Sequence, residues 1–377
     1  ISFGWCFERL ENNTKRILSG RSGSQYTLRL LCLQFYLGDE SISIVQSVAD
    51  TMERQMVGSA EFEILTKKEH ILCTEDEFVF HGGQLMALSE ACPNAFAGLT
   101  CLKLENVSLN KPELPNIISL CKRLEFLRLF NCDMGIPSSL EVEHPRLGQL
   151  VMEDCQLERV HLKWLPKLTM LTFNYWISQE DPLSFGYVPL LQSVSLANIG
   201  LSWHKMLKLS EFLRNATIGT LQLNFKCEKI WIQPEDPEQL LPVFNKLRLV
   251  NLYGIIFCEM MLDEDMRRQY AYSTEKKGID WELGVSDFKH HKLAVLKIFG
   301  FGPEENFVNY VRSIIEAAVN LEDIYLFNKL VCESCKDNVP KASRSPWPKK
   351  QRFSLRNRIT NGTNSLVTIH FPSSNSH

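Results

Sequence analysis

Leucines recur along this chain in one short pattern, which constrains the fold more than any other feature. Two leucine-like residues lie three positions apart, a third follows two positions later, and a small or sulfur-containing residue comes three positions after that. Three consecutive segments match throughout: Leu99, Leu102, Leu104, Val107 and Leu109; Leu124, Leu127, Leu129, Cys132 and Met134; and Leu147, Leu150, Met152, Cys155 and Leu157. Intervals of 25 and then 23 residues separate Leu102, Leu127 and Leu150, and a repeat of roughly 20 to 29 residues is typical of a solenoid.

Weaker copies extend the pattern over most of the chain. They lie at residues 30–35, 168–173, 191–201, 218–223, 247–252, 293–298 and 321–326. In such alternating stretches the apolar side chains point to one face of a strand. One unit cannot bury that face alone, so several must stack. The sequence therefore predicts a leucine-rich-repeat solenoid of the α/β class, with a curved parallel sheet and with helices and turns on its convex side.

The segments between the strands predict helices and turns. Helical spacing of apolar residues predicts helices over residues 41–57, 84–91 and 307–318. Ser41 is the expected N-cap of the first. Prolines that fix the entry into a strand precede three repeats: Pro145, Pro166 and Pro189. Cys132 and Cys155 lie where the chain leaves a strand, and we expect both thiols to be buried and structural.

The regularity of the repeats predicts the segments of the chain. The period breaks between Val250 and Leu296, where charged residues are frequent. The predicted segments are 1–27, an N-terminal segment; 28–257, leucine-rich repeats; 258–291, a charged insertion or one degenerate repeat; 292–336, the last repeats; and 337–377, a linker with a closing strand. The tail is basic from Lys341 onward. It is interpreted either as a solvated linker before that strand or as a nuclear-import or nucleic-acid segment.

Composition argues against several classes of protein. The formal net charge is −3, so the chain does not resemble a nucleic-acid or membrane-surface binder. Apolar runs stay below the roughly 18 residues of a membrane span. The first residues lack the layout of a signal peptide. The 12 cysteines are irregularly spaced, which favours a reduced cytoplasmic or nuclear location over a disulfide scaffold.

The sequence contains no familiar catalytic motif. We find no nucleophile elbow, P-loop, dinucleotide fingerprint or zinc-protease helix, so we expect no enzyme, no cofactor and no metal. Cys332 and Cys335 form a CxxC, which could be half of a zinc site, a redox pair or two ordinary cysteines. His290 and His291 are adjacent, so their side chains diverge. We expect His144 to be a structural, hydrogen-bonding histidine, like His370 near the closing strand.

The residues between the core leucines should line the concave face of the solenoid. Because parallel strands stack in register, these positions form columns, and aromatics beside arginine are frequent at binding hot spots. The candidate partner-binding residues are Phe126, Arg128, Phe130, Glu153, Asn224, Tyr253, Phe299, Tyr325 and Phe327. The alternative is that these aromatics stack on one another, or lie beneath the basic tail, and bind nothing.

Longer stretches of the chain resemble one family. They are ACPNAFAGLTCLKLENVSL from Ala91, CKRLEFLRLFNCDMG from Cys121, EHPRLGQLVMEDCQL from Glu143, FGYVPLLQSVSLAN from Phe185, and SLRNRITNGTNSLVTIHFP from Ser354. Together they resemble the leucine-rich repeats of plant F-box proteins, in the large grass group that ends in an FBD-like segment. The more specific elements are PNAFAGLT, EHPRL and the closing HFP.

This resemblance implies a function. In that family an F-box docks on the Skp-type adaptor of a cullin-based ubiquitin ligase, and the repeats capture the target protein. This chain shows no helical segment opening with Leu-Pro, so the F-box is expected before Ile1 and adaptor docking falls on no residue here. The expected function is substrate recognition for a ligase, without membrane or nucleic-acid partners. The alternative is an interaction scaffold with no ligase role.

Overall fold

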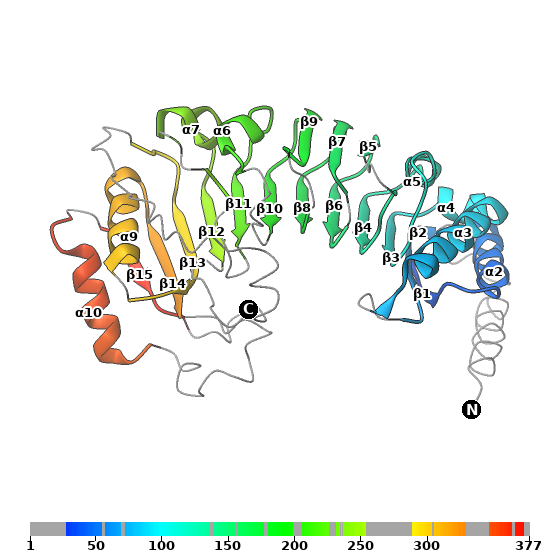
Figure 1. The fold of residues 1–377 in the computed structure, drawn as a ribbon, viewed down its shortest axis with the longest axis horizontal. Coiled ribbons are helices and arrows are strands. Elements are labelled where there is room, and N and C mark those ends of the chain that lie inside the picture. The colour runs from blue at the N-terminus through cyan, green and yellow to red at the C-terminus, as the bar shows by residue number, and fades with distance from the viewer. Residues whose placement is uncertain are drawn as a thin grey trace. The chain divides into compact units, whose positions relative to one another are not determined.

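A computed structural model gives the fold, whose strands and helices are drawn in Figure 1, and the chain divides into two compact units. Unit 1 comprises Ile1–Ser178 with Pro182–Leu191, and unit 2 comprises Gln179–Asp181 with Gln192–His377. The structure describes residues 28–54, 57–68, 72–135, 139–155, 157–176, 180–198, 206–225, 231–233, 235, 237–253, 289–303, 305–328, 347–363 and 366–372. Most of the expected insertion at 258–291, together with Cys332 and Cys335, lies outside these residues.

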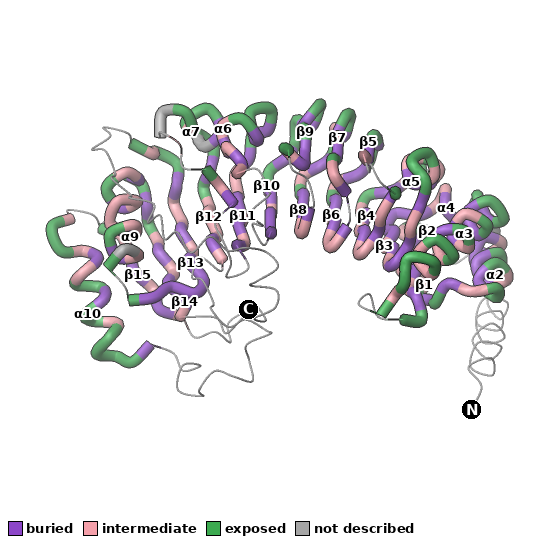
Figure 2. Tube along the Cα trace, in the orientation of Figure 1, coloured by how far each residue is buried: buried purple, intermediate pink, exposed green. Residues whose placement is uncertain are grey.

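The larger sheet of unit 1 is built from parallel strands in chain order. The strands are β1 (Leu28–Tyr36), β2 (Val57–Leu65), β3 (Cys101–Glu105), β4 (Phe126–Phe130), β6 (Gln149–Glu153) and β8 (Met170–Asn174). Leu102, Leu127, Leu150 and Leu171 pair in one continuous register. These leucines are buried, and burial alternates along β4, β6 and β8 (Figure 2), so side chains at every second position form the core.

The return segments of three repeats in unit 1 form a second, smaller sheet. Its strands are β5 (Ser139–Glu143), β7 (Arg159–Trp164) and β9 (Leu183–Tyr187), and they too run parallel. Helices and turns were predicted in these places. Leu140 and Val142 are buried two positions apart, as are Val160 and Leu162. This spacing is typical of a strand, but the prediction made no use of it.

Helices fill the other return segments of unit 1. They are α2 (Ser41–Arg54), α3 (Glu75–Ala91), α4 (Pro93–Ala97) and α5 (Glu113–Leu120). Ser41 is the first residue of α2 and not its N-cap as predicted, and its hydroxyl accepts a hydrogen bond from the amide of Gly38 at 3.0 Å. The helix predicted over 84–91 is longer than expected, because Thr74 and Glu77 form a capping box that starts it at Glu75, about two and a half turns earlier.

Unit 2 repeats the same architecture. Its parallel strands are β10 (Ser193–Ala197), β11 (Thr220–Asn224), β12 (Leu249–Tyr253), β13 (Val295–Phe301), β14 (Asp323–Asn328) and β15 (Thr368–His370). Its helices are α6 (Leu209–Phe212), α7 (Pro237–Phe244), α9 (Glu305–Ala317) and α10 (Lys349–Thr360). The structure confirms the helix expected near 307–318 and the closing strand, and it adds α10 where a linker was expected.

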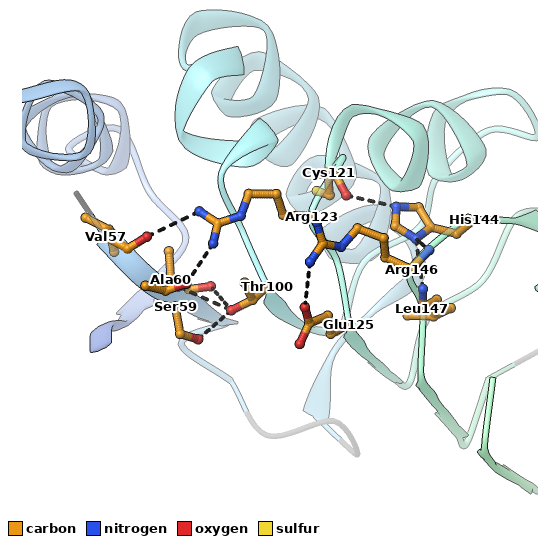
Figure 3. A network of polar contacts seen from close by, with 11 residues as sticks. Val57, Ser59, Ala60, Thr100, Cys121, Arg123, Glu125, His144, Arg146 and Leu147 are labelled. Atoms are coloured by element: carbon orange, nitrogen blue, oxygen red, sulfur yellow. Dashed lines mark hydrogen bonds and ion pairs between the residues drawn. The ribbon is translucent and has the colours of Figure 1, made fainter. Parts of the chain in front are cut away.

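The strands of unit 1 begin at turns that are held by polar side chains (Figure 3). The Thr100 hydroxyl donates to the carbonyl of Ala60 at 3.0 Å and accepts from its amide at 3.2 Å. His144 is buried, and its Nε2 donates to the carbonyl of Cys121 at 3.0 Å. Its Nδ1 accepts from the amides of Arg146 and Leu147 at 3.2 and 3.1 Å. His144 is therefore the structural histidine that the sequence predicted, and it is neutral in this arrangement.

The chain leaves four strands of unit 1 through a left-handed residue. Asn106, Asn131, Asp154 and Tyr175 follow β3, β4, β6 and β8 with φ of 55°, 50°, 53° and 60°. Asparagine and aspartate tolerate this conformation better than most residues. Asn106 is fully buried, where its amide donates to Thr66 Oγ1 and its Oδ1 accepts from Asn131, both at 2.6 Å. This pair of amides ties consecutive repeats together.

The two cysteines after β4 and β6 close the same turns. Cys132 and Cys155 are buried, and their thiols donate to the carbonyls of Phe130 and Glu153, each at 3.4 Å. Burial raises the pKa of the Cys132 thiol well above its ordinary value. Both thiols are thus structural, as the sequence predicted.

Candidate protein-binding face

The first, third and fifth side chains of each core strand point away from the buried leucines. We call the surface that they form in each unit the repeat face. In unit 1, Phe126, Arg128 and Phe130 on β4 pair with Gln149, Val151 and Glu153 on β6. Of these six, Gln149 is exposed and the others are half-buried. Four predicted residues, namely Phe126, Arg128, Phe130 and Glu153, therefore lie together on neighbouring strands.

An ion pair organises the centre of this face in unit 1. Arg128 Nε and Nη2 lie 3.0 and 2.9 Å from Glu153 Oε2. The Arg128 guanidinium also lies 5.2 Å from the centre of the Phe130 ring, and Asn174 Nδ2 donates to Glu153 Oε1 at 3.3 Å. The Arg128 and Glu153 side chains remain 35% and 28% exposed. The pair is held in place and can still be reached from solvent.

Further charged side chains lie in the rows beside this ion pair. Lys103 on β3 lies beside Arg128 in register, and its Nζ is 3.5 Å from the Glu63 carboxylate on β2. Two cations therefore lie in neighbouring rows between Glu63 and Glu153. Parallel pairing places each carboxylate where a neighbouring row supplies a cation. Glu63, Lys103 and Asn174 were not among the predicted site residues, although each occupies an odd position of a strand.

Aromatic rings dominate the repeat face of unit 2. The Tyr253 and Phe299 rings stack with centres 3.9 Å apart, and those of Phe299 and Phe327 with centres 4.2 Å apart, each pair within 8° of parallel. Phe299 is 1% exposed and Phe327 is 6% exposed. Burial raises the pKa of the Tyr253 hydroxyl. Stacking of the aromatics on one another, which the sequence left open, is thus what the structure shows for this column.

A second stack lies along the third-position column of unit 2. The rings of Tyr325 and His370 are 4.4 Å apart, and Lys297 Nζ lies 5.6 Å from the centre of the Tyr325 ring. His370 Nε2 is 2.6 Å from Asp323 Oδ1, which fixes the imidazole on β15 to the neighbouring strand. Tyr325 is half-buried, as is Asn224, which pairs with Tyr253 at the fifth position. Lys297 and His370 were not among the predicted site residues.

The described residues offer little for catalysis. Among them, no three His, Cys, Asp or Glu side chains gather as metal ligands would. His161 Nδ1 and Ser184 Oγ are 2.6 Å apart on the small sheet, with Glu141 as the neighbour of His161 in register. The Glu141 carboxylate instead binds Lys163 Nζ at 2.6 Å, and this contact lowers the pKa of Glu141. Glu141 therefore does not orient the imidazole in the way that the carboxylate of a nucleophilic triad does.

Part of this chain is similar to the repeats of a known family. Residues 80–206, which include β3 to β10, match the family described as FBD-associated F-box protein At5g56370, LRR repeats. No curated protein matches the chain. The match supports a plant protein of the F-box and leucine-rich-repeat type and suggests a role in protein interaction. The grass group and the FBD-like closing segment stay predictions.

The same comparison supports a non-enzymatic interaction module with protein partners. Within the described ranges, no helix is long and apolar enough to cross a membrane.

Proposed function

We propose that this chain is the target-recognition part of a cullin-based ubiquitin ligase. The single observation that supports the ligase context is the match of residues 80–206 to the repeats of an F-box protein. The mechanism is proximity: the repeats hold a target protein while other subunits carry out ubiquitin transfer. Adaptor docking belongs to an F-box, and we expect the assembly to act in the cytoplasm, the nucleus or both.

The repeat face of unit 1 is the proposed target-binding surface. Its ion pair between Arg128 and Glu153 is already positioned by strand register and by the Phe130 ring. Binding therefore costs little additional side-chain order, which favours affinity. Phe126 and Phe130 remain half-buried, so each can still lose exposed apolar surface to a partner. A target with a carboxylate facing Arg128 and an apolar side chain facing Phe130 fits this surface.

A charge exchange tests the proposed surface without loss of the ion pair. The double variant Arg128→Glu, Glu153→Arg keeps opposite charges on the same two strands but inverts the pattern that a target meets. We expect affinity capture from plant extract, quantified by mass spectrometry, to recover a target with the native chain that the double variant loses. The single variant Arg128→Glu, with two facing carboxylates, serves as the control for weakened folding. A double variant that retains every native partner would show that the repeat face of unit 1 does not select targets.

The ligase context needs a separate experiment. We expect the full-length gene product to form a complex with a Skp-type adaptor in a pull-down with purified components. A full-length product that does not bind the adaptor would leave the alternative, a leucine-rich-repeat scaffold with no ligase role. The charge exchange is independent of this outcome, because it tests target binding alone.

A further inference from the structure

We propose that the outer face of helix α10 docks an acidic segment of a partner protein. Three properties of α10 point to such a surface: arginines that fix the helix to the fold, cations that remain exposed, and one exposed phenylalanine. This surface is separate from the repeat face and does not depend on the proposed ligase function.

The arginines of α10 hold the helix in place. Arg352 Nε donates to the carbonyl of Trp347 at 2.6 Å, and Arg356 Nη2 donates to the carbonyl of Ile369 at 2.9 Å. Arg358 Nη1 donates to the carbonyl of Pro303 at 3.0 Å, and its Nη2 lies 2.6 Å from the Glu305 carboxylate. The Arg356 and Arg358 contacts anchor α10 to β15 and to the start of α9, and the Arg352 contact holds the segment just before the helix. Three of the five cations of α10 therefore stabilise the fold.

The remaining two cations lie on the outer side of the helix. Lys349 and Lys350 are exposed and form no ion pair with any residue that the structure describes. Phe353 follows one turn later and is 68% exposed. Leu355 and Ile359, which pack inward, are buried. By helical spacing Lys349, Lys350 and Phe353 share the side opposite these two residues.

Charge complementarity indicates which kind of partner the outer face of α10 would bind. From Lys349 to Thr360 the helix carries five cations and no acidic residue, so it attracts a segment that is acidic. The exposed ring of Phe353 supplies an apolar contact at the centre of the basic face, and aromatic residues are enriched where partners dock. An acidic segment that also carries apolar side chains matches both features.

The same observations favour protein over membrane or nucleic acid. A helix that lies on a membrane needs a continuous apolar face, and the apolar side of α10 is turned into the fold. The guanidinium groups, which are the groups best suited to phosphates, contact backbone carbonyls or Glu305. Two lysines and a single ring remain, which is a small surface suited to a peptide.

Fluorescence anisotropy with a labelled peptide of alternating glutamate and leucine tests this proposal on the full chain. We expect saturable binding that weakens about tenfold or more in the double variant Lys349→Glu, Lys350→Glu and separately in Phe353→Ser, as truncation of a docking residue does. A matched control is Lys111→Glu, Lys122→Glu, which makes the same charge change at two exposed lysines of unit 1. We expect this control to bind the peptide as the native chain does.

Several results would overturn the proposal. One is the absence of saturable binding. Another is an equal loss of affinity in the control, which would show that net charge alone is responsible. Replacement of leucine by serine in the peptide should also weaken binding, and an unchanged affinity would remove the role of Phe353. Tighter binding of phosphatidylserine vesicles or of a single-stranded oligonucleotide, with the same dependence on the two lysines, would reassign the face to membranes or nucleic acid.

Discussion

Two adjacent glycines of helix α3 should respond in opposite ways to the same substitution. A Cβ atom at Gly82 would lie 1.8 Å from the carbonyl oxygen of Ser108, whereas a Cβ atom at Gly83 would meet nothing within 4 Å. Ser108 cannot readily retreat. Its amide donates to the carbonyl of Phe78 at 3.1 Å, and its side chain is hydrogen-bonded to Asp133 in the next repeat.

The difference in the free energy of unfolding can be worked out from the effect that the two substitutions have in common. Alanine stabilises the interior of a helix over glycine by about 1 kcal/mol, and this gain is the same for Gly82→Ala and Gly83→Ala. The difference between the two variants is therefore the cost of moving α3 away from Ser108. Overpacking of this kind costs about 1–3 kcal/mol, and an overlap with a backbone oxygen puts Gly82→Ala at the upper end. We expect Gly83→Ala to be more stable than the native chain and Gly82→Ala less stable.

Urea denaturation followed by circular dichroism measures both free energies of unfolding. The expected difference between the variants is about 3 kcal/mol, with little change in the slope against urea. Equal midpoints for the two variants would refute the close packing of α3 on the turn at Ser108. A lower slope for Gly82→Ala alone would show instead that unfolding had lost its cooperativity.

Two further predictions concern the turns of unit 1. Burial lowers the pKa of His144, so the folded state disfavours its proton, and we expect the urea midpoint to be constant above pH about 6.5 and to fall as the pH drops below it. In His144→Asn this part of the pH dependence should disappear, and a native-like pH profile in that variant would argue against the assignment. Asn106→Ala should destabilise the protein by about 2–4 kcal/mol, because it removes the hydrogen bonds of a buried amide and places alanine at φ of 55°. Asn106→Gly relieves only the backbone strain and should recover about 1 kcal/mol of this loss in the same denaturation assay.

Leucine spacing was sufficient to predict the core strands. Each predicted repeat from Leu102 to Leu326 contains a core strand whose inward-facing apolar side chains are buried, apart from the half-buried Val250, because alternation with a period of two has only one way to bury its apolar side chains. The helices were harder to place. Thr74 and Glu77 form a capping box that marks the start of α3, but it precedes the apolar residues on which the prediction relied. Helix α10 was not predicted, because its arginines are also typical of a solvated tail. The structure shows the backbone carbonyls to which these arginines donate.

The sequence predicted that side chains of the repeat face stack in columns, but it did not predict which interactions those side chains form. Strand register, which places Glu153 diagonally across from Arg128 and Phe299 directly beside Tyr253, depends on loop lengths that vary from repeat to repeat. The sequence marked these residues as similar candidates, since all occupy odd positions. In three dimensions an ion pair forms in one unit and a buried ring stack in the other. Whether an ion pair or a ring stack forms depends on contacts between neighbouring repeats, and the sequence of a single repeat does not encode these contacts.

This difference determines where selectivity for a partner can reside. The rings of Phe299 and Phe327 are already buried, so contact with a partner would remove little further apolar surface from water. They stabilise unit 2 whether or not a target is bound. Arg128 and Glu153 differ because both remain partly exposed, and a target that covers them removes water from two charges at once. That desolvation is costly unless the target supplies hydrogen bonds of its own, so we expect the proposed surface to select targets whose groups complement the ion pair.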